Sequence, residues 1–472
     1  MAVANLRSTD LATPLEPPRV LAALESAGLE APFLLESALP FPGLGRTSFL
    51  GFGPRWRLER RAAGDPLGEL AARLAAHGIP RAAREATGLP FAGGAVGFLG
   101  YDLGRTIERL PSRAAADQAF PALSFAYYAH VLAHDAETGR WTFAGDGEGF
   151  DAACEAARRA IEGFEDERGD GDGDEDGDED GDEPEPEYPF LRSNFPRDGY
   201  LRAVERAIEY IRAGDIYQVC LSQRFEARAA GAGPLALYER LRRVSPAPFM
   251  ACLRDAAGRA VLSASPERFL AVRGRRVETR PIKGTRPRGR TPPEDAALGR
   301  ELVESRKDAA ELAMIVDLER NDLGRAALPG SVRVSRPRAL ESFPAVHHLV
   351  ATVEADLRPG IGPCDLLRAA FPGGSVTGCP KVRAMEIIDE LEPTRRSVYC
   401  GAIGYLGRDA DLDLAIAIRT ALVDGDRATF QAGGAVTADS DPAAEFEETL
   451  VKARALARAL RGRVGPCPAS RT

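Results

Sequence analysis

The sequence of 472 residues has no apolar run long enough to cross a membrane and no closely paired cysteines. Spanning a bilayer takes roughly 20 consecutive apolar residues, and no stretch here approaches that length. The N-terminal segment also lacks a basic region followed by an apolar one, so it does not resemble an export signal. Seven scattered cysteines, none in a CxxC pair, argue against a disulfide framework and a zinc site. These absences predict a cytoplasmic protein with reduced thiols and no membrane partner.

A clustered excess of positive charge is also missing. The formal net charge is −9, but residues 165–187 alone hold 15 acidic residues and one arginine, a net of −14. The rest of the chain therefore carries about five net positive charges, which suits an anionic small-molecule substrate. Nucleic-acid binding needs a face rich in Lys and Arg with stacking aromatic residues. The sequence shows no such face, so we expect no nucleic-acid partner.

The acidic run at residues 165–187 is almost entirely Asp, Glu and Gly. It cannot bury enough apolar surface to offset the entropy of ordering it, so it is predicted to be a disordered linker. Its alternating Asp and Gly residues raise the possibility of a calcium loop. An EF-hand loop, however, ends in a Glu between two helices, a pattern that this run lacks. A solvated spacer is therefore the favoured interpretation.

The linker separates an N-terminal lobe, residues 1–164, from a C-terminal lobe, residues 188–462, which is followed by a loose tail at residues 463–472. In the first lobe, short apolar runs alternate with helical stretches rich in Ala and Arg, which predicts mixed sheet and helix. The second lobe opens with a helix that begins at Pro196 and stops at Gly214, and a strand follows at once. It ends in a helix rich in Glu, Lys and Ala.

Packing alone does not explain four polar segments of the second lobe: SASPERFL, PIKGTRPRG, ELAMIVDLERNDLGR and ADSDPAAEFEETLVKA. In the first two, strands are predicted on both sides of a tight turn centred near residue 274. The antiparallel register of this hairpin places Glu267 opposite about residue 281, and therefore close to Lys283. A structural ion pair would explain these two residues by itself. A catalytic role needs support from other segments.

The acidic helices of the last two segments provide that support. Glu445 and Glu448 are three residues apart and share a helix face with Lys452, while Glu311 belongs to a second helical pattern. If these carboxylates line one pocket without His or Cys beside them, they suit a hard cation such as Mg²⁺. Either helix taken singly is better explained as a solvated face. The metal site therefore depends on the coincidence of both.

Eight motifs occur in order along the second lobe: SxSPExF, PIKGTRPRG, AExxMIVDLxRNDLGR, VHHLV, FPGGSVTGCPK, YCGAIGY, DLAIAIRT and ADSDPAAEFEETLVKA. Together they resemble the chorismate-utilising enzymes, a family that includes anthranilate synthase component I, aminodeoxychorismate synthase component I, isochorismate synthases and salicylate synthases. The first lobe resembles the family less sharply, through LLES at residues 34–37 and GGAVGFLGYD at residues 93–102. The resemblance implies a two-lobed α+β fold of largely antiparallel sheets wrapped by helices, with the active site in the second lobe.

The resemblance also implies roles for individual residues. Chorismate would be the substrate, and Mg²⁺ would hold its ring carboxylate through Glu311, Glu445 and Glu448. Its enolpyruvyl carboxylate would be bound by Arg419, Tyr399 and the backbone N–H groups of a glycine turn at Gly433 and Gly434. The pocket would be completed by Ser375, Gly284, Thr285 and Lys452. His348 would lie near the leaving C4 hydroxyl, and Glu267 would protonate it. That role requires burial to raise the pKa of Glu267 from about 4.3.

Lys283 and Gln218 distinguish members of the family from one another. Anthranilate synthases carry PIAGT, and the water-adding members also have a small residue at this position, whereas PIKGT resembles the aminodeoxychorismate synthases. A neutral lysine amine can attack C2 of chorismate as the C4 hydroxyl leaves, and ammonia can then displace it by adding at C4. Gln218 stands where water-adding relatives have a lysine base, and a glutamine cannot activate water. The resemblance thus favours aminodeoxychorismate formation for p-aminobenzoate and folate synthesis, with anthranilate synthase component I as the alternative.

The activities that the two lobes do not contain indicate which partner proteins the chain needs. No glutaminase segment with Cys, His and Glu and no pyridoxal-phosphate lyase segment is evident, so ammonia is expected from a separate glutamine amidotransferase subunit. In relatives LLES belongs to a tryptophan pocket, which makes Glu36 and Ser37 candidate tryptophan contacts; an ordinary strand end is the other interpretation. A non-catalytic subunit that binds chorismate or tryptophan is a further alternative. Such a subunit would lack some acid, metal or nucleophile position, and all are filled here.

One position departs from the family pattern. Ala435 stands where the usual GxGIVADS turn has a glycine. Any positive φ at this residue would be strained by its Cβ, so the sequence predicts a weaker carboxylate contact there.

Overall fold

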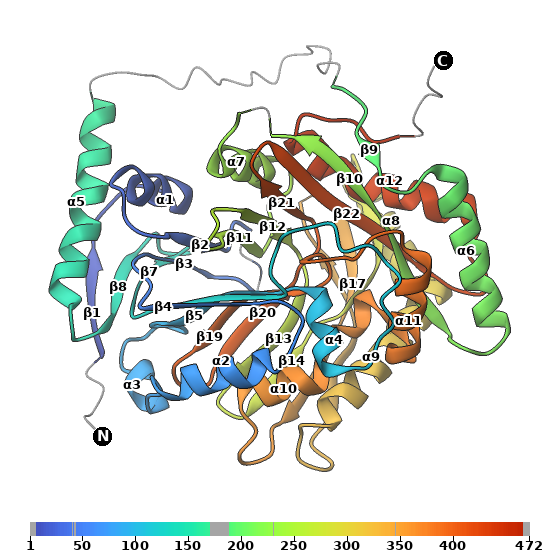
Figure 1. The fold of residues 1–472 in the computed structure, drawn as a ribbon, viewed down its shortest axis with the longest axis horizontal. Helices are drawn as coiled ribbons and strands as arrows, with labels where there is room; N and C mark the ends of the chain where they lie inside the picture. The colour runs from blue at the N-terminus through green and yellow to red at the C-terminus, as the bar shows by residue number, and fades with distance from the viewer. Residues whose placement is uncertain are drawn as a thin grey trace.

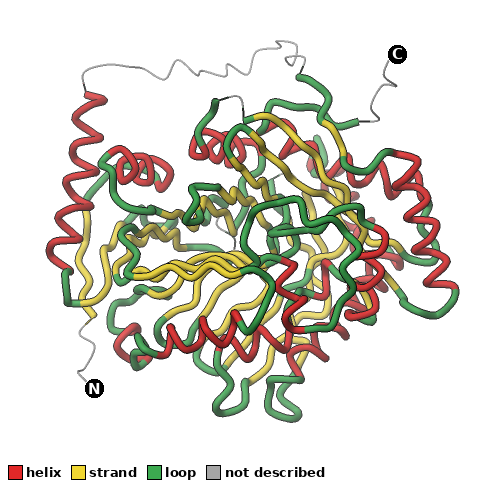
Figure 2. The backbone as a smooth tube through the Cα atoms, viewed as in Figure 1, coloured by secondary structure: helices red, strands yellow, loops and turns green. Residues whose placement is uncertain are grey.

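The computed structural model describes residues 6–39, 41, 44–169, 188–229, 231–344 and 346–465. Two large antiparallel sheets form its centre, and helices lie around them (Figures 1 and 2). The predicted α+β class is confirmed. In the described residues the helices are α1 Pro17–Ser26, α2 Pro66–Ala75, α3 Arg81–Glu85, η1 Tyr101–Leu103, α4 Gly104–Ile107, α5 Phe150–Gly169, α6 Arg197–Arg212, α7 Pro234–Val244, α8 Pro292–Glu304, α9 Arg306–Gly324, α10 Pro363–Ala370, η2 Gly374–Val376, α11 Lys381–Leu391 and α12 Pro442–Ala459.

The first sheet has 12 strands in the described residues, in the order β1-β8-β7-β3-β2-β11-β12-β21-β22-β10-β18, with β9 paired to β10. Their bounds are β1 Leu6–Leu11, β2 Phe33–Glu36, β3 Thr47–Gly51, β7 His130–Asp135, β8 Trp141–Asp146, β9 Arg192–Ser193, β10 Gln218–Arg228, β11 Phe249–Arg254, β12 Ala260–Ser265, β18 Gly378–Cys379, β21 Thr420–Asp424 and β22 Arg427–Val436.

The second sheet has 10 strands, counted in the same ranges, in the order β15-β17-β14-β13-β20-β19-β5-β6-β4, with β16 paired to β17. Their bounds are β4 Trp56–Arg60, β5 Gly94–Leu99, β6 Leu123–Tyr128, β13 Arg268–Arg273, β14 Arg276–Thr279, β15 Ile282–Pro287, β16 Arg333–Ser342, β17 Val346–Asp356, β19 Ala402–Gly407 and β20 Leu412–Ile416.

Both sheets are shared between the two sides of the predicted linker. In the first sheet β2 pairs with β11, and Cys252 lies opposite Leu34. In the second sheet β19 pairs with β5 along its whole length, from Ala402 opposite Leu99 to Gly407 opposite Gly94. The two predicted lobes are therefore not two separate sheets, because each sheet joins an N-terminal and a C-terminal part of the chain.

The predicted linker begins inside a helix. Helix α5 continues to Gly169, five residues beyond the predicted end of the first lobe at residue 164. The remaining linker residues, 170–187, and most of the predicted tail, 466–472, lie outside the described residues. In the described part of the chain, no helix is long and apolar enough to cross a membrane.

Local sequence signals explain the elements that lead into the site. Helix α6 follows Pro196 and is closed by Gly214, whose φ of +84° suits a residue without a Cβ. The β13–β14 hairpin pairs Val272 with Val277 and Arg273 with Arg276. This register is centred within one residue of the predicted position.

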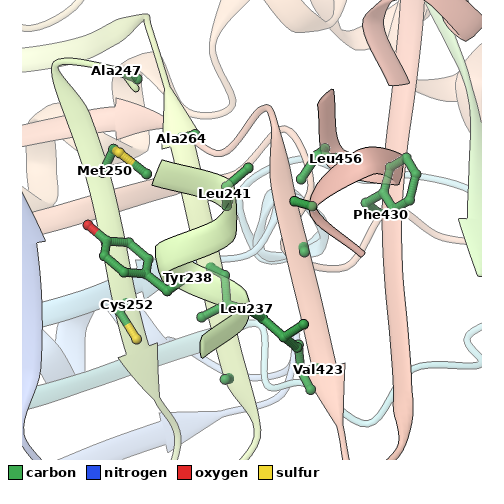
Figure 3. Packing of buried hydrophobic residues seen from close by; sticks show 14 of the residues in the cluster. Leu237, Tyr238, Leu241, Ala247, Met250, Cys252, Ala264, Val423, Phe430 and Leu456 are labelled. Carbon is green, nitrogen blue, oxygen red and sulfur yellow. The ribbon is translucent and has the colours of Figure 1, made fainter. Parts of the chain in front are cut away.

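The core of the first sheet is formed where helices lie across it. Leu237, Tyr238 and Leu241 of α7 face Met250 and Cys252 of β11 (Figure 3). All of these residues are buried. Full burial of one such side chain contributes about 1.5–3 kcal/mol. This packing fixes β12, whose end leads directly to Glu267.

Candidate active site

The turn between β12 and β13 places Glu267 in the interior. Its side chain is 5% exposed, and burial raises the pKa of its carboxyl to about 7. Four neighbours work in the opposite direction: the Ser375 side chain and the Ile282 N–H donate hydrogen bonds to it, and Lys283 and Lys452 contribute positive charge. The predicted neighbourhood of Glu267 and Lys283 is thus confirmed. A carboxyl with this pKa can donate a proton near neutral pH.

Ser375 joins the acid to the lysine. It lies in the short helix η2, where its side chain reaches Glu267 and its carbonyl oxygen accepts a hydrogen bond of 3.1 Å from Lys283 Nζ. Lys283 itself lies on β15 at an irregularity of the pairing with β17, and the next residue, Gly284, has a φ of +73°. A Cβ at Gly284 would stand 2.7 Å from Leu302 Cδ1. Only glycine fits there, so the bulge that presents Lys283 depends on it.

Three carboxylate side chains, one on α9 and two on α12, form the acidic part of the candidate site. Glu445 and Glu448 lie one turn apart on α12, and the charges of Glu448 and Glu311 act on each other across the gap between the helices. Burial raises the pKa of Glu311 and of Glu445. Partial burial opposes ionisation of Glu448 as well, but Lys452, 2.6 Å away, outweighs it and lowers the pKa of that carboxyl. The carboxylates of the two predicted acidic helices therefore act on one another, and their role as metal ligands stays a prediction.

The donor set and its surroundings fit a hard cation. Oxygen Oε2 of Glu445 is buried and has no partner in the described ranges, while Oε1 accepts a hydrogen bond of 2.7 Å from Ser440. A Cβ at Gly434 would meet this free oxygen at 2.8 Å and Glu448 Oε1 at 3.3 Å. In the described ranges, however, no three His, Cys, Asp or Glu side chains are close enough to form a complete metal site. The ligands would have to draw together around an ion.

A partly buried cation and a neutral histidine act on each other electrostatically. Burial lowers the pKa of the Arg419 guanidinium, and within the described ranges no carboxylate forms an ion pair with it. Its backbone φ of +49° is left-handed, which is a strained conformation for a residue with a Cβ. Burial and then the charge of Arg419 lower the pKa of His348 to about 3. His348 is therefore uncharged at neutral pH, while Arg419 lacks a counter-ion.

The two nitrogens of His348 have different surroundings. Nδ1 lies 3.0 Å from Thr285 Oγ1 and 3.5 Å from the Gly284 carbonyl oxygen. Nε2 is buried and has no partner in the described part of the chain. A buried, unpaired nitrogen costs free energy unless a ligand satisfies it. Nε2 is thus available to a substrate hydroxyl.

Comparison with known proteins identifies the family. A family model described as chorismate binding enzyme matches residues 33–458. Anthranilate synthase component 1 of Streptomyces coelicolor is 42% identical over 437 residues, which cover 92% of this chain and 84% of that protein. Aminodeoxychorismate synthase component 1 of Klebsiella aerogenes is 45% identical over 368 residues, which cover 77% of this chain and 76% of that protein. This chain belongs to the chorismate binding enzyme family.

A solved structure supports the same conclusion. Anthranilate synthase component I from Streptococcus pneumoniae matches this fold with a TM-score of 0.74 and 31% identity, over 89% of this chain and 93% of that one. The family model extends into the first lobe as far as residue 33, so both parts of the chain belong to one family unit. This extent agrees with the sharing of both sheets.

The glycine segment of this chorismate binding enzyme differs from the prediction. Gly433 and Gly434 are not in a turn but inside β22, opposite Ser222 and Leu221 of β10. Glycine is needed there because a Cβ at Gly433 would lie 2.4 Å from the Leu221 carbonyl oxygen, and one at Gly434 would reach Glu445. Ala435 lies in the same strand and is not among the positive-φ residues. The strain predicted for Ala435 is therefore absent.

Three further predicted residues surround the cluster. Lys452 donates to the Gly433 carbonyl oxygen at 3.1 Å. Gln218 is fully buried at the start of β10, where its Oε1 has no partner in the described ranges and its Nε2 lies 3.9 Å from Cys220 Sγ. Tyr399 is buried before β19, and its contacts are with Arg396 and Cys400 rather than with the carboxylates.

Two residues that the sequence reasoning missed also shape the site. Lys307 lies 4.0 Å from Glu311 and lowers the pKa of Glu448, and its i,i+4 spacing on α9 was a detectable signal. Arg396 is buried, forms an ion pair of 2.7 Å with Glu392, and donates to the Val376 carbonyl oxygen. Its partner Glu392 is only four residues away, whereas the Cys220 carbonyl oxygen, which also accepts a hydrogen bond from it, comes from a distant segment.

Glu36 and Ser37 lie apart from this cluster, at a second site. They line a cavity of about 1030 Å³ together with Met250, Tyr405 and Asp413. The Glu36 carboxylate accepts hydrogen bonds of 2.5 Å from Tyr238 and 2.8 Å from Arg242. Glu36 is thus already paired, and it ties β2 to α7.

Proposed function

We propose that this chorismate binding enzyme is an aminodeoxychorismate synthase component I. It would convert chorismate and ammonia to 4-amino-4-deoxychorismate and water, as a step toward p-aminobenzoate and folate. One observation carries the proposal: Lys283 and Glu267 both form a hydrogen bond with Ser375. An amine therefore lies beside a carboxyl that can donate a proton.

The proposed reaction has two steps. Lys283 attacks C2 of chorismate as the ring double bond shifts and the C4–O bond breaks, and Glu267 gives its proton to the departing hydroxyl, which leaves as water. Ammonia then adds at C4, the double bond shifts back, and the C2–N bond to Lys283 breaks. Lys283 is thereby released as a free amine, and the proton that ammonia loses returns to Glu267. The enolpyruvyl group is never broken.

Substrate binding follows from the distribution of charge. The unpaired Arg419 guanidinium suits one carboxylate of chorismate, and a charge-assisted fork is the geometry that a carboxylate favours. His348 would contact a substrate hydroxyl through Nε2, which is buried and has no partner in the described ranges. Glu311, Glu445 and Glu448 would hold Mg²⁺, which supplies positive charge for the other carboxylate.

The ammonia would come from a partner. The similar proteins named above are each called component 1 or component I, which implies a second component. We propose that the second component is a separate glutamine amidotransferase subunit.

Anthranilate synthase component I is the alternative, because relatives with both names are about equally similar to this chain. Anthranilate formation requires loss of the enolpyruvyl group as pyruvate, whereas aminodeoxychorismate keeps it. The decisive experiment incubates the protein with chorismate, Mg²⁺ and ammonium and identifies the product by mass spectrometry. We expect an aminated product that retains the enolpyruvyl group. Anthranilate with an equal amount of pyruvate would contradict the proposal.

For the second cavity we propose tryptophan as the ligand, on the basis of Glu36, Ser37 and the apolar Met250 in its lining. Titration calorimetry with tryptophan should show saturable heat, and phenylalanine should bind more weakly. Absence of heat with tryptophan would exclude this ligand.

A further inference from the structure

Glu319 is a buried acid of α9 that the mechanism above leaves unused. It is 2% exposed, and its Oε1 accepts a hydrogen bond of 2.9 Å from the Gly374 N–H. Oxygen Oε2 has no partner in the described ranges. Keeping a carboxyl in the interior without a partner for each oxygen costs free energy. Because Glu319 is present despite this cost, we expect its carboxyl to have a function.

The hydrogen bond from the Gly374 N–H connects Glu319 to the two proposed catalytic residues, Glu267 and Lys283. Gly374 is the first residue of η2, and the next residue, Ser375, holds Glu267 through its side chain and Lys283 through its carbonyl oxygen. The turn is seated against α9, since a Cβ at Gly374 would lie 2.7 Å from Leu318 Cδ2 and 3.0 Å from Glu319 Oε1. A shift of Gly374 would therefore move the anchor of both catalytic groups.

The two ends of η2 are held by different side chains. Arg396 holds the far end by donating to the Val376 carbonyl oxygen at 2.8 Å. Glu319 holds the near end through the Gly374 N–H. Without Glu319, a buried N–H group would lose its acceptor, and the end of the turn next to Ser375 would lose its polar anchor.

We propose that Glu319 is a positioning residue for amination: it fixes the Gly374–Ser375 turn, and the turn fixes Glu267 and Lys283 relative to each other. This inference rests on the proposed function and adds a residue to its machinery. Misplacing reacting groups by as little as about 1 Å can cost about 100-fold in rate. The effect of Glu319 should therefore appear in kcat more than in KM.

The charges around Glu319 agree with a role as a hydrogen-bond acceptor. Asp322 on the same helix, Lys381 of α11 and Glu267 all act on it. Burial, followed by the repulsion from Asp322, raises the pKa of Glu319 well above its ordinary value, which favours the neutral carboxyl. An amide oxygen of the same reach could accept the Gly374 N–H equally well, which makes glutamine the conservative replacement.

The test compares Glu319→Gln with Glu319→Leu and Glu319→Asn, of which only the first keeps an acceptor that reaches Gly374. Leu and Asn should lower kcat by about 10- to 100-fold while KM for chorismate stays nearly constant. They should also move the alkaline limb of the kcat/KM profile to higher pH. The reason is that Ser375 would no longer stabilise the Glu267 carboxylate, leaving the Ile282 N–H, Lys283 and Lys452 to do so. Glu319→Gln should restore both kcat and the position of the limb.

Leu323→Ala serves as the structural control, because Leu323 is buried on the same helix and takes no part in the hydrogen bonds that join Glu319, Gly374 and Ser375. It should lower Tm without moving the alkaline limb. A Gln variant that is as slow as the Leu and Asn variants, or an Asn variant with the kcat and pH profile of the wild type, would overturn the positioning role. If the wild type forms anthranilate instead of aminodeoxychorismate, the proposed function fails separately. The ratio of each variant's kcat to that of the wild type still tests the role of Glu319 in that case, because both reactions need a proton for the leaving hydroxyl.

Discussion

The side chains of the site carry charges of both signs. Carboxylates of α9 and α12 form one group, and the unpaired Oε2 of Glu445 suits a cation. Arg419, without a counter-ion in the described ranges, forms the other, beside the uncharged His348. Under the proposed function, a cation held by the carboxylates and the Arg419 guanidinium would each bind one carboxylate of chorismate.

The pKa of Glu267 predicts the pH dependence of catalysis. A general acid is active only when protonated, so the protonated fraction, and with it kcat/KM, should fall as pH rises through about 7. Glu267→Gln should lower kcat by about 10²–10⁴-fold and remove this limb from the profile. Measurement of kcat/KM from pH 5.5 to 9, an interval of about 1.5–2 units on each side of the pKa, checks both points. A variant that kept the wild-type limb would show that another group is the acid.

Lys283 should matter less than Glu267. Lys283→Ala should slow aminodeoxychorismate formation strongly yet leave residual activity, because ammonia can attack C2 directly in the vacated space and the product can shift toward anthranilate. Incubating the wild type with chorismate and Mg²⁺ but without ammonia, followed by intact-protein mass spectrometry and peptide mapping, should reveal an adduct on Lys283. If Lys283→Ala forms aminodeoxychorismate at the wild-type rate, the lysine is not the nucleophile.

Glu448 is predicted to be a ligand that activity requires. Glu448→Gln should abolish Mg²⁺-dependent turnover while leaving the fold intact, since its side chain is 47% exposed and contributes little packing. Glu447→Gln, at an exposed position next to it on α12, is the matched control and should keep wild-type turnover. Turnover is measured against Mg²⁺ concentration, with circular dichroism as the check on folding. Full activity of the wild type in excess chelator would contradict the metal requirement.

Individual elements differ in how far their sequence determines them. The β13–β14 hairpin was predicted to within one residue, because its register depends only on the turn at Gly274 and the residues beside it. The segment around Gly433 was predicted as a turn but is a strand. Gly433 is needed because β10, about 200 residues earlier in the sequence, approaches it closely, and no local pattern reveals that contact.

The approach of α12 to β22 makes Gly434 sensitive to substitution. Gly434→Ala would place a Cβ 2.8 Å from Glu445 Oε2, so either α12 shifts or the carboxylate turns away from its neighbours. We expect weaker Mg²⁺ activation and lower kcat, together with a modest loss of Tm. Gly163→Ala is the control, because its Cβ would have nothing within 4 Å, and it should leave activity unchanged. Equal Mg²⁺ activation curves for Gly434→Ala and the wild type would show that this close approach does not shape the metal site.

For the whole molecule, the α+β class of the fold was predictable from the sequence, but the sharing of both sheets across the predicted linker was not. The motifs that carry the site residues lie within short segments, which the sequence displays directly. The pairing of β2 with β11 and of β5 with β19 joins residues more than 200 positions apart. Such pairing leaves no periodic signal in either segment, so the acidic run indicated a boundary between two lobes but could not show that both sheets extend across it.

The shared sheets predict how the molecule responds to a break between its halves. If a protease site is inserted within residues 170–187 and cut, β2 still lies between β3 and β11, and β5 still lies between β6 and β19. The two pieces should therefore elute together in gel filtration and keep their turnover. Residues 188–472 produced alone should aggregate or melt without cooperativity, because β11 and β19 would then expose unpaired edges. Uncut protein carrying the same insertion is the control for turnover. Separation of the cut pieces without denaturant, or a cooperative melt of residues 188–472 alone, would show that the two lobes fold independently despite their shared sheets.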